Sequence, residues 1–379
     1  MKWKSKDYCR KNTDPKLRGA FLELVKCGLR TVTRLDPVYF NWMEEKDWDN
    51  LFRLVQKHSV TGICFPVIEL LPIGLRPPSV IYLKWFGQVQ YIKATSFRMR
   101  EVLHEVNQRL EPLRVFPVLM KGLGIACWYP NPSLRMAGDI DLYIPGDYNE
   151  VIDYVEAWGF LMTYMPNHDK VEYKGVCIEL HHQLIRFPIA TEWKLEVAVV
   201  SDGFADYRIP DADTNALLLL THAAKHLIGP GVGIRHLCDW AVFLRHNHQV
   251  VNFEKLWKEL EHLGLKRFAI EFTALAYDCF QVDCPAILPW CAASDERLKQ
   301  RLLDDIIERG DCGRQNMEWR RKCKWFAYYI TLTVRLLKFR VYCPKYMNKV
   351  AWHRVVGRMK FVFRGDPFGS SLKYTRQRK

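Results

Sequence analysis

The stretch Gly-Asp-Ile-Asp-Leu at residues 138–142 alternates acidic and apolar side chains, a pattern typical of a short strand. Because side chains alternate between the two faces of a strand, Asp139 and Asp141 are expected on one face, and Ile140 and Leu142 in a core. Two neighbouring carboxylates raise each other's pKa unless a cation lies beside them. Oxygen ligands of this kind suit Mg²⁺, which binds one or two carboxylates together with substrate phosphates. The stretch therefore indicates metal-dependent phosphate chemistry.

Two further features of the sequence extend this pattern. The apolar run at residues 115–120 ends at Lys121-Gly122, which is typical of a strand that enters a turn whose backbone N–H groups approach phosphate oxygens. Glu179 stands between apolar residues in a later predicted strand, where it either joins the two aspartates or lies on a solvated face. Three carboxylates on neighbouring strands can hold two Mg²⁺ ions, one orienting a triphosphate and one lowering the pKa of an attacking hydroxyl.

Basic and imidazole side chains accompany these carboxylates, and each has two interpretations. Arg135 either clamps a phosphate with its bidentate fork or pairs with an acidic loop residue. His181 and His182 follow the third carboxylate directly. Either one of them faces the predicted site and lines the substrate, or they cap the strand at the surface.

A second histidine pair lies further along the chain. His222 and His226 are one helical turn apart, so both can face the same ligand. A structural or substrate-lining role is favoured over metal binding, since zinc needs a further ligand. Asp239 or His236 would supply that ligand only if the chain folded back.

The order of these motifs resembles that of the nucleotidyltransferase superfamily, in which a glycine turn precedes an Asp-x-Asp or Asp-x-Glu strand and a third carboxylate. The chain is more closely similar to the bacterial uncharacterised nucleotidyltransferase family, over about residues 20–280. The motifs that carry this similarity are Val118-Leu119-Met120-Lys121-Gly122, Tyr129-Pro130, Arg135, Gly138-Asp139-Ile140-Asp141-Leu142, Glu179-Leu180-His181, Thr221-His222-Ala223-Ala224-Lys225-His226 and Arg235-His236-Leu237-Cys238-Asp239.

The resemblance implies a Mg²⁺-dependent enzyme that moves a nucleoside monophosphate from an NTP, expected to be ATP, to an acceptor hydroxyl and releases pyrophosphate. It implies that Asp139 and Asp141 bind metal and that Glu179 completes the site as a ligand or base. The residues that it assigns to the nucleotide phosphates are Lys121, Gly122 and Arg135.

One residue departs from the superfamily pattern. Leu123 follows the turn glycine where the superfamily usually has glycine or serine, so the contact of a serine hydroxyl with phosphate is missing. Lys121 or Arg135 is expected to replace that contact. Two alternatives to transfer onto a small molecule or sugar stay open: AMP transfer onto a protein side chain, as in toxin–antitoxin pairs, and nucleotide or partner binding without catalysis.

The predicted elements indicate an α+β fold, in which a small mixed-sheet core of the nucleotidyltransferase kind is flanked by N-terminal and C-terminal helical regions. We expect the N-terminal helical region at 1–112, the α/β core at 113–212, the C-terminal helical region at 213–318 and a basic, aromatic-rich tail at 319–379. Predicted strands lie at 115–120, 139–144, 170–173 and 176–180, the last two forming a hairpin. Predicted helices lie at 80–112, 123–129, 148–158, 216–227, 234–246, 253–263, 268–280, 295–309 and from 319 onward.

The chain's net charge of +14 arises from the tail. Residues 319–379 contain 17 Lys and Arg residues against one acidic residue, Asp366, whereas the other 318 residues have a net charge of −2. The tail is expected to pack on the body with a solvated basic face, to lie on an anionic membrane, or to bind a phosphate-rich polymer. Its predicted amphipathic helix presents the apolar residues Trp325, Tyr328, Tyr329, Leu332, Leu336 and Phe339 beside the basic residues Lys324, Arg335, Lys338 and Arg340.

The remaining composition favours a folded cytoplasmic protein. Hydrophobic residues make up 49% of the chain, which excludes a disordered protein. The 12 cysteines include no Cys-x-x-Cys pair, so reduced thiols are expected rather than disulfides or structural zinc. The polar first residues are unlike a signal peptide, and no window has the length and apolarity of a spanning helix.

Overall fold

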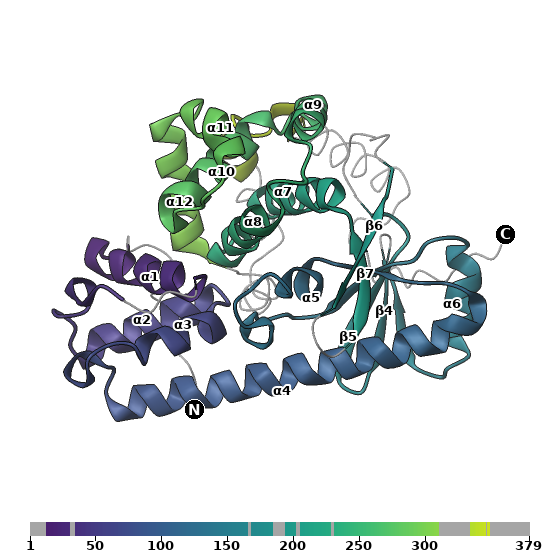
Figure 1. Ribbon diagram of the computed structural model, residues 1–379, viewed down its shortest axis with the longest axis horizontal. Helices are drawn as coiled ribbons and strands as arrows, with labels where there is room; N and C mark the ends of the chain where they lie inside the picture. The colour runs from purple at the N-terminus through teal and green to yellow at the C-terminus, as the bar shows by residue number, and fades with distance from the viewer. Residues whose placement is uncertain are drawn as a thin grey trace, which may run out of the picture.

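A seven-stranded mixed sheet and two sets of helices make up the described part of the chain (Figure 1). The computed structural model describes residues 13–30, 35–165, 168–184, 194–201, 205–228, 231–310, 334–345 and 347–348. Helices both precede and follow the sheet in the chain. The α+β class predicted from the sequence is therefore confirmed.

The sheet has the strand order β3-β4-β5-β2-β1-β7-β6. Strand β2 pairs in parallel with β5, and β1 in parallel with β7, whereas the other neighbours are antiparallel. The two edge strands, β3 and β6, were not predicted from the sequence, and neither was β7. The strands are β1 (Val118–Met120), β2 (Ile140–Tyr143), β3 (Leu161–Tyr164), β4 (His168–Tyr173), β5 (Val176–His181), β6 (Val197–Ser201) and β7 (Asp206–Pro210).

The predicted hairpin forms between β4 and β5. Its two turn residues, Lys174 and Gly175, both have positive φ angles, 49° and 73°. Two consecutive left-handed residues match the right-handed twist of the flanking strands, so a two-residue turn suffices. This turn sets the antiparallel register that pairs Lys170 with Glu179.

The helices agree with the sequence pattern, with shifts of a few residues at their ends. Five of them follow an Asp or Asn whose side chain accepts hydrogen bonds from the first turn: α1, α6, α7, α9 and α12. The α-helices are α1 (Pro15–Gly28), α2 (Glu45–Lys57), α3 (Thr61–Ile68), α4 (Ser79–Leu110), α5 (Lys121–Ala126), α6 (Tyr148–Glu156), α7 (Ala212–Ile228), α8 (Ile234–Asn247), α9 (Phe253–Leu263), α10 (Lys266–Phe280), α11 (Leu288–Ala292) and α12 (Glu296–Arg309). Short 3-10 helices lie at Pro37–Tyr39, Ile73–Leu75, Glu111–Leu113, Pro132–Leu134 and Pro285–Ile287.

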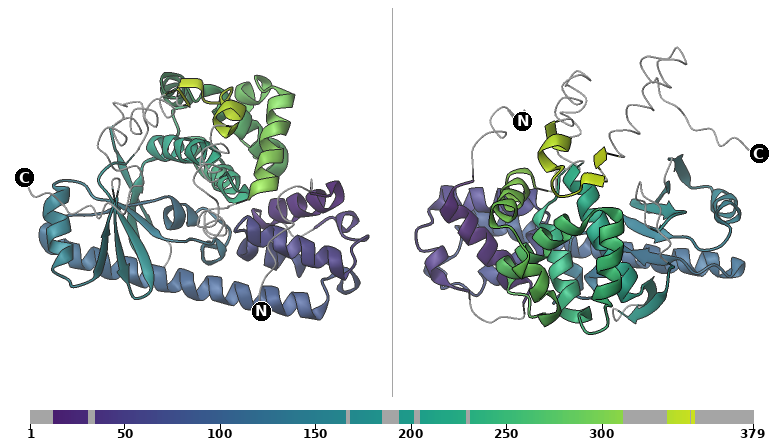
Figure 2. Two further views of the ribbon diagram at one scale, coloured as in Figure 1. Left: turned by 180° about the vertical axis from the view of Figure 1, so that it is seen from behind. Right: turned by 90° about the horizontal axis from the view of Figure 1, so that it is seen from above.

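Helix α4 belongs to both hydrophobic cores of the molecule. Figures 1 and 2 show it running along one side, from the N-terminal helices to the sheet. Near its start, Trp85 is fully buried in the helical core and donates from its indole N–H to the Thr61 carbonyl at 3.0 Å. Near its end, Val102 and Leu110 are buried in the sheet core. One long helix thus sets the position of the sheet relative to the helices.

The N-terminal and C-terminal helical regions share a single core, which the sequence pattern did not reveal. Phe21 from α1 and Phe272 from α10 are both buried in it. The sheet core is separate and lies between the sheet, the second half of α4 and α6. Figure 1 shows α7 and α8 between the sheet and the helices α9–α12.

The described part of the basic tail packs on α12. The Arg335 guanidinium is buried, pairs with the Asp305 carboxylate at 3.2 Å and donates to the Leu227 carbonyl. Phe339 is fully buried, so this part of the predicted apolar face is covered by the body. The predicted anchors at 325–332 lie outside the described residues.

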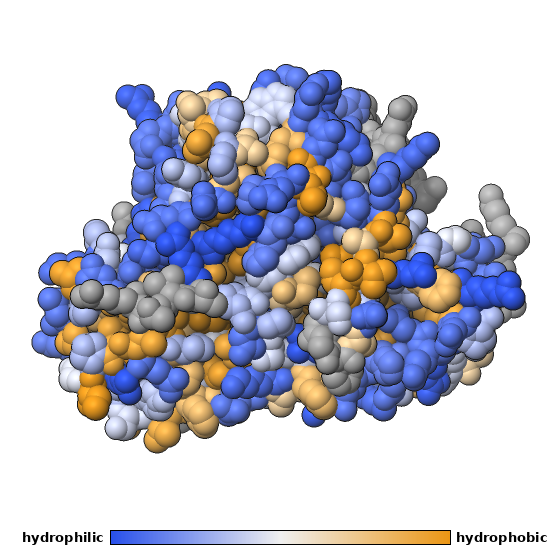
Figure 3. All heavy atoms as spheres, in the orientation of Figure 1, coloured by the Kyte–Doolittle hydropathy of each residue, from blue (hydrophilic) through white to orange (hydrophobic). Residues whose placement is uncertain are grey.

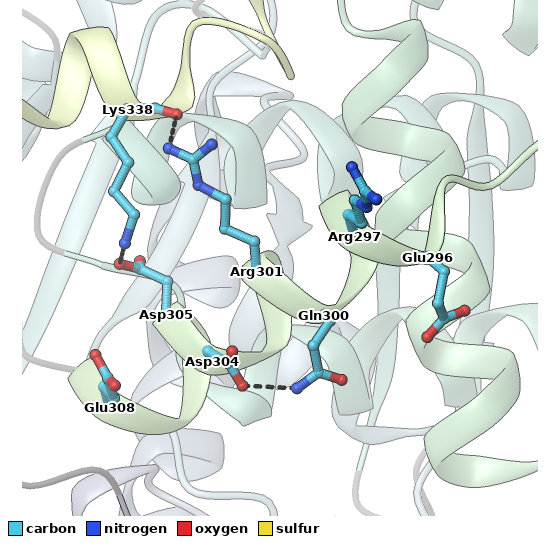
Figure 4. Close-up of a pocket in the computed structure, with 8 residues that line it drawn as sticks. All are labelled: Glu296, Arg297, Gln300, Arg301, Asp304, Asp305, Glu308 and Lys338. Carbon is cyan, nitrogen blue, oxygen red and sulfur yellow. Dashed lines mark hydrogen bonds and ion pairs between the residues drawn. The ribbon is translucent and has the colours of Figure 1, made fainter.

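A pocket lies where this segment meets α12 (Figure 4). Lys338 Nζ lies 3.6 Å from Asp305 Oδ1, and Arg301 Nη2 donates to the Lys338 carbonyl oxygen at 2.7 Å. Charged groups of both signs thus pair across the contact, which leaves the basic face of this segment partly neutralised. The residues that line the pocket are Glu296, Arg297, Gln300, Arg301, Asp304, Asp305, Glu308 and Lys338.

Three further features concern the hydropathy of the helices, the surface and the cysteine side chains. Among the described residues, no helix is both long enough and apolar enough to cross a membrane. The face in Figure 3 is largely hydrophilic, with hydrophobic residues in separate groups. The cysteines within the described ranges are all free thiols, as expected.

Replacing Gly62 with alanine is expected to destabilise the protein by about 1–3 kcal/mol, the usual cost of overpacking a core. Gly62 lies in α3, and a Cβ atom there would clash with the Leu134 backbone oxygen. This contact joins α3 to the loop that precedes the aspartate strand. Urea unfolding followed by circular dichroism measures the loss.

The matched control is Gly87→Ala in α4, where nothing lies within 4 Å of the added Cβ atom. That variant is expected to gain roughly 0.5–1 kcal/mol, because alanine favours a helix interior over glycine. Equal stabilities of the two variants would contradict the close contact at Gly62.

Candidate active site

The parallel pairing of β2 with β5 places Asp141 directly opposite Glu179. Directly opposed residues on neighbouring strands point to the same face, so these two carboxylates lie side by side. Asp139 immediately precedes β2, and the negative charges of Asp141 and Glu179 both act on it. The three carboxylates predicted from the sequence therefore gather on one face of the sheet, and Glu179 is not on the solvated side.

Cationic side chains surround two of these carboxylates. The Lys121 ammonium donates to Asp141 Oδ1 at 2.9 Å, and His181 Nε2 lies 2.8 Å from the same oxygen. Lys170 on β4 pairs with Glu179, and its position follows from the hairpin register. These partners offset the repulsion between the two acids.

The pKa directions follow from this arrangement. Burial works to raise the pKa of Asp141, but Lys121 and His181 hold that pKa well below its usual range. Burial also opposes ionisation of Glu179, yet hydrogen bonds from His181 and Lys170 lower its pKa to about 2. Burial lowers the pKa of His181, and its bonds to the two acids raise that pKa above the usual value. Asp141 and Glu179 are thus carboxylates at neutral pH.

Asp139 is the exception among the three acids. Its pKa is raised, first by burial and then by the charges of Asp141 and Glu179. Within the described ranges it makes no hydrogen bond or ion pair. The charges of Lys121 and Arg235 act in the opposite direction but do not outweigh these effects. Oxygen donors of this kind fit Mg²⁺.

Lys121 and Gly122 are the first residues of α5 and directly follow β1. Because the sequence predicts a phosphate-binding turn here, we call them the phosphate turn. Lys121 has a φ angle of 49°, in the left-handed region that non-glycine residues rarely adopt. Gly122 has φ 15° and ψ −104°, so the first residues of α5 are not regular helix. Leu123 is buried in the sheet core, which explains an apolar residue directly after the turn glycine. The helix ends at Ala126, three residues earlier than predicted.

Arg135 lies in a buried network with Asp239 and Tyr129. Its Nη2 donates to Asp239 Oδ2 at 2.6 Å, and the Tyr129 hydroxyl donates to Asp239 Oδ1 at 2.7 Å. Arg135 is 5% exposed, so of its two interpretations the one in which it pairs with an acidic residue is confirmed. That acidic residue lies on α8 and not in a loop as expected. Asp239 is therefore engaged by Arg135 and is not a ligand for the histidine pair.

The two histidines after Glu179 have different surroundings. His181 faces the acids, as described above. His182 is exposed, and its ring lies against the Tyr148 ring with centroids 5.4 Å apart.

His222 and His226 lie on α7, with their Nε2 atoms 3.1 Å apart. His236 on α8 completes a group whose ring nitrogens all lie within 4.8 Å of one another, so the fold-back does occur. Burial, and then the charge of His226, lowers the pKa of His222 well below its usual value.

Two residues of the site were missed from the sequence, His168 and Lys170. His168 Nε2 lies 3.5 Å from Glu179 Oε2, and Lys170 pairs with the other oxygen of that carboxylate. Counting outward from the two-residue turn of the hairpin would have found both, because the register follows from the turn.

Comparisons with known proteins identify a family for most of the chain. The model of a family described as "Uncharacterised nucleotidyltransferase" matches residues 44–281. A solved structure, described as an antigenic nucleotidyltransferase-like protein from Paracoccidioides brasiliensis, is similar at 12% identity and a TM-score of 0.31. The match covers 50% of this chain and 96% of that one. No curated protein matches the chain.

Replacing Asp239 with asparagine is expected to cost about 3–5 kcal/mol of stability, because the buried Arg135 charge loses its partner. Chemical unfolding followed by tryptophan fluorescence measures the change. Asp49→Asn is the matched control, since Asp49 pairs with Arg53 at 2.8 Å on the surface, with 35% and 40% of the two side chains exposed. That variant is expected to lose less than about 1 kcal/mol. Equal losses would contradict the role of burial at Asp239.

Proposed function

The chain belongs to the uncharacterised nucleotidyltransferase family, and from this premise we propose that it transfers a nucleoside monophosphate from an NTP to the hydroxyl of an acceptor. Pyrophosphate is the second product, and ATP is the proposed donor. The reaction depends on Mg²⁺. The acceptor is a small molecule, a sugar or a protein side chain that carries a hydroxyl.

The observation that carries this proposal is the gathering of Asp139, Asp141 and Glu179 on one face of the sheet, and the raised pKa of Asp139 agrees with it. The charges of Asp141 and Glu179 act on this acid, and no cationic side chain within the described ranges bonds to it. The charges of Lys121 and Arg235 also act on Asp139, but its pKa is still raised. Binding of Mg²⁺ beside Asp139 relieves the repulsion that raises its pKa.

Asp139, Asp141 and Glu179 are the proposed ligands of two Mg²⁺ ions. When bound, Mg²⁺ supplies positive charge to the triphosphate and lowers the pKa of the attacking hydroxyl. Glu179 serves as a ligand rather than as the base, since a carboxylate with a pKa of about 2 accepts a proton poorly.

The chain's own residues bind and orient the donor. The phosphate turn lies at the end of β1, beside Asp141, and its backbone N–H groups approach phosphate oxygens. The Lys121 ammonium offsets triphosphate charge from the same turn. Arg135 does not reach phosphate in this proposal, because it is buried against Asp239; it positions the turn through the loop that precedes β2.

The transfer is an in-line displacement at the α-phosphorus. The acceptor oxygen forms a bond to that phosphorus, and the bond from the phosphorus to the oxygen that bridges to the β-phosphate breaks. Pyrophosphate leaves with the bonding electron pair, and the hydroxyl proton is lost to solvent.

The double variant Asp139→Asn/Asp141→Asn is expected to reduce transfer at least about a hundredfold, since metal ligation supplies several kcal/mol of transition-state stabilisation. The assay incubates the protein with α-labelled NTPs, Mg²⁺ and a cell extract as the acceptor source. Separation of labelled protein from labelled small molecules identifies the acceptor class.

Asp206→Asn is the control, because Asp206 is exposed at the start of β7, away from the three acids. It is expected to transfer label like the wild type. Equal transfer by the double variant, or Mg²⁺-independent transfer, would overturn the mechanism. NTP binding without any transfer would favour the non-catalytic alternative.

Lys121→Met is expected to weaken NTP binding about tenfold or more, because a charge-assisted hydrogen bond to phosphate is lost. The same variant should bind the corresponding NMP nearly as well as the wild type, since the lost charge serves the triphosphate. Isothermal titration calorimetry with both nucleotides measures the two affinities. An equal loss for NTP and NMP would mean that Lys121 maintains the fold of the site and does not contact the triphosphate.

A further inference from the structure

Three histidines, His222, His226 and His236, come together outside the three-carboxylate site. We call them the histidine cluster. His222 and His226 lie on the C-terminal half of α7, and His236 lies in the first turn of α8. Each offers a ring nitrogen, and these nitrogens all lie within 4.8 Å of one another. The group thus forms only because α8 folds back against α7.

The spacing of the nitrogens fits a metal ion. His222 Nε2 and His226 Nε2 are 3.1 Å apart. Zinc–imidazole bonds of about 2.0–2.1 Å in a tetrahedral site put neighbouring ligand nitrogens about 3.3–3.4 Å apart. The pair is therefore within a few tenths of an ångström of the separation that two zinc ligands need.

The third ring is oriented by the backbone. His236 Nδ1 lies 3.3 Å from both the carbonyl oxygen and the amide nitrogen of Gly233, at the start of α8. Metal-binding histidines usually hold one ring nitrogen on a carbonyl or carboxylate, which fixes the tautomer and turns the other nitrogen toward the metal. The ring is 7% exposed, so its direction is also restricted by packing.

The donor set decides which kind of ion fits. Imidazole nitrogens suit zinc, copper or nickel, whereas Mg²⁺ prefers oxygen ligands. Three histidines leave a fourth tetrahedral position for water or another ligand. The chemistry thus separates this cluster from the carboxylates on the sheet.

A second group, His168, Glu179 and His181, also brings possible ligand atoms together. It includes a proposed Mg²⁺ ligand and belongs to the site already described. The histidine cluster contains none of those residues. It is therefore the independent candidate.

We propose that His222, His226 and His236 bind one zinc ion that joins the end of α7 to the start of α8. Between these helices the chain passes through Gly231, whose φ angle is 119°. The ion holds this corner together. Helix α8 also carries Asp239, which pairs with Arg135, and Arg235, which donates to the Met136 carbonyl at 3.1 Å. The zinc site thereby stabilises the helix that supports the loop before β2.

The test uses the full chain without a histidine tag, purified, stripped with a chelator and dialysed against Zn²⁺. Elemental analysis by mass spectrometry is expected to find one zinc per wild-type chain and none in His222→Ala/His226→Ala. Replacement of zinc by Co²⁺ is expected to give the visible absorption of a four-coordinate site with three imidazole ligands. Added Zn²⁺ should raise the melting temperature of the wild type and leave that of the double variant unchanged.

Two controls locate the ion. His246→Ala/His248→Ala removes two histidines from the other end of α8, where both rings contact backbone carbonyls, and should keep its zinc. Asp139→Asn/Asp141→Asn should also keep its zinc, which makes this test independent of the proposed transfer reaction. If the double histidine variant misfolds by circular dichroism, His226→Gln replaces it, with an expected loss of zinc affinity of about tenfold or more.

Three outcomes would overturn the proposal. A wild-type chain with no zinc and no cobalt spectrum would mean that His222 and His226 share a proton. Zinc lost from the aspartate variant but kept by the histidine variant would assign the ion to the carboxylates. Unchanged zinc affinity in both His222→Ala/His226→Ala and His226→Gln would show that these rings are not ligands.

Discussion

The site depends on the repulsion between two carboxylates that the sheet holds side by side. The parallel register of β2 and β5 sets Asp141 directly opposite Glu179, and neither backbone can move without breaking the sheet. The two acids therefore need positive charge beside them, and His181 at the end of β5 supplies part of it. Lys121 on the phosphate turn and Lys170 on the hairpin supply part of it, and Asp139 is left without such a partner among the described residues. That remaining imbalance is what makes the site suitable for a divalent cation.

The helices matter to this site because they hold its loops in place. Helix α4 takes part in both cores, so the sheet and the helical body cannot shift independently. The buried pair of Arg135 and Asp239 ties the loop before β2 to α8. The same helix begins at the histidine cluster, which connects it to α7.

Much of the fold and of the candidate site could be predicted from local sequence. The helices at 253–263 and 234–247 were found nearly to the residue, because their apolar periodicity is regular and Asn252 caps the first of them. The β4–β5 hairpin was found from its Lys-Gly turn. The short strands β3, β6 and β7 were missed, since β3 and β6 lie at the sheet edges, where none of their side chains is fully buried, and β7 ends in proline.

The sequence by itself determined the chemistry available here: acidic side chains alternating on a strand, a glycine turn before them and a third acid on a later strand. These features are local, because the strand period and the turn conformation depend only on neighbouring residues. Only the tertiary structure decided which charges meet. It paired Arg135 with Asp239, 104 residues away, rather than with phosphate, and it brought His236 to His222 and His226. Such pairings depend on how helices pack, and packing follows from the shape of the whole core rather than from any one segment.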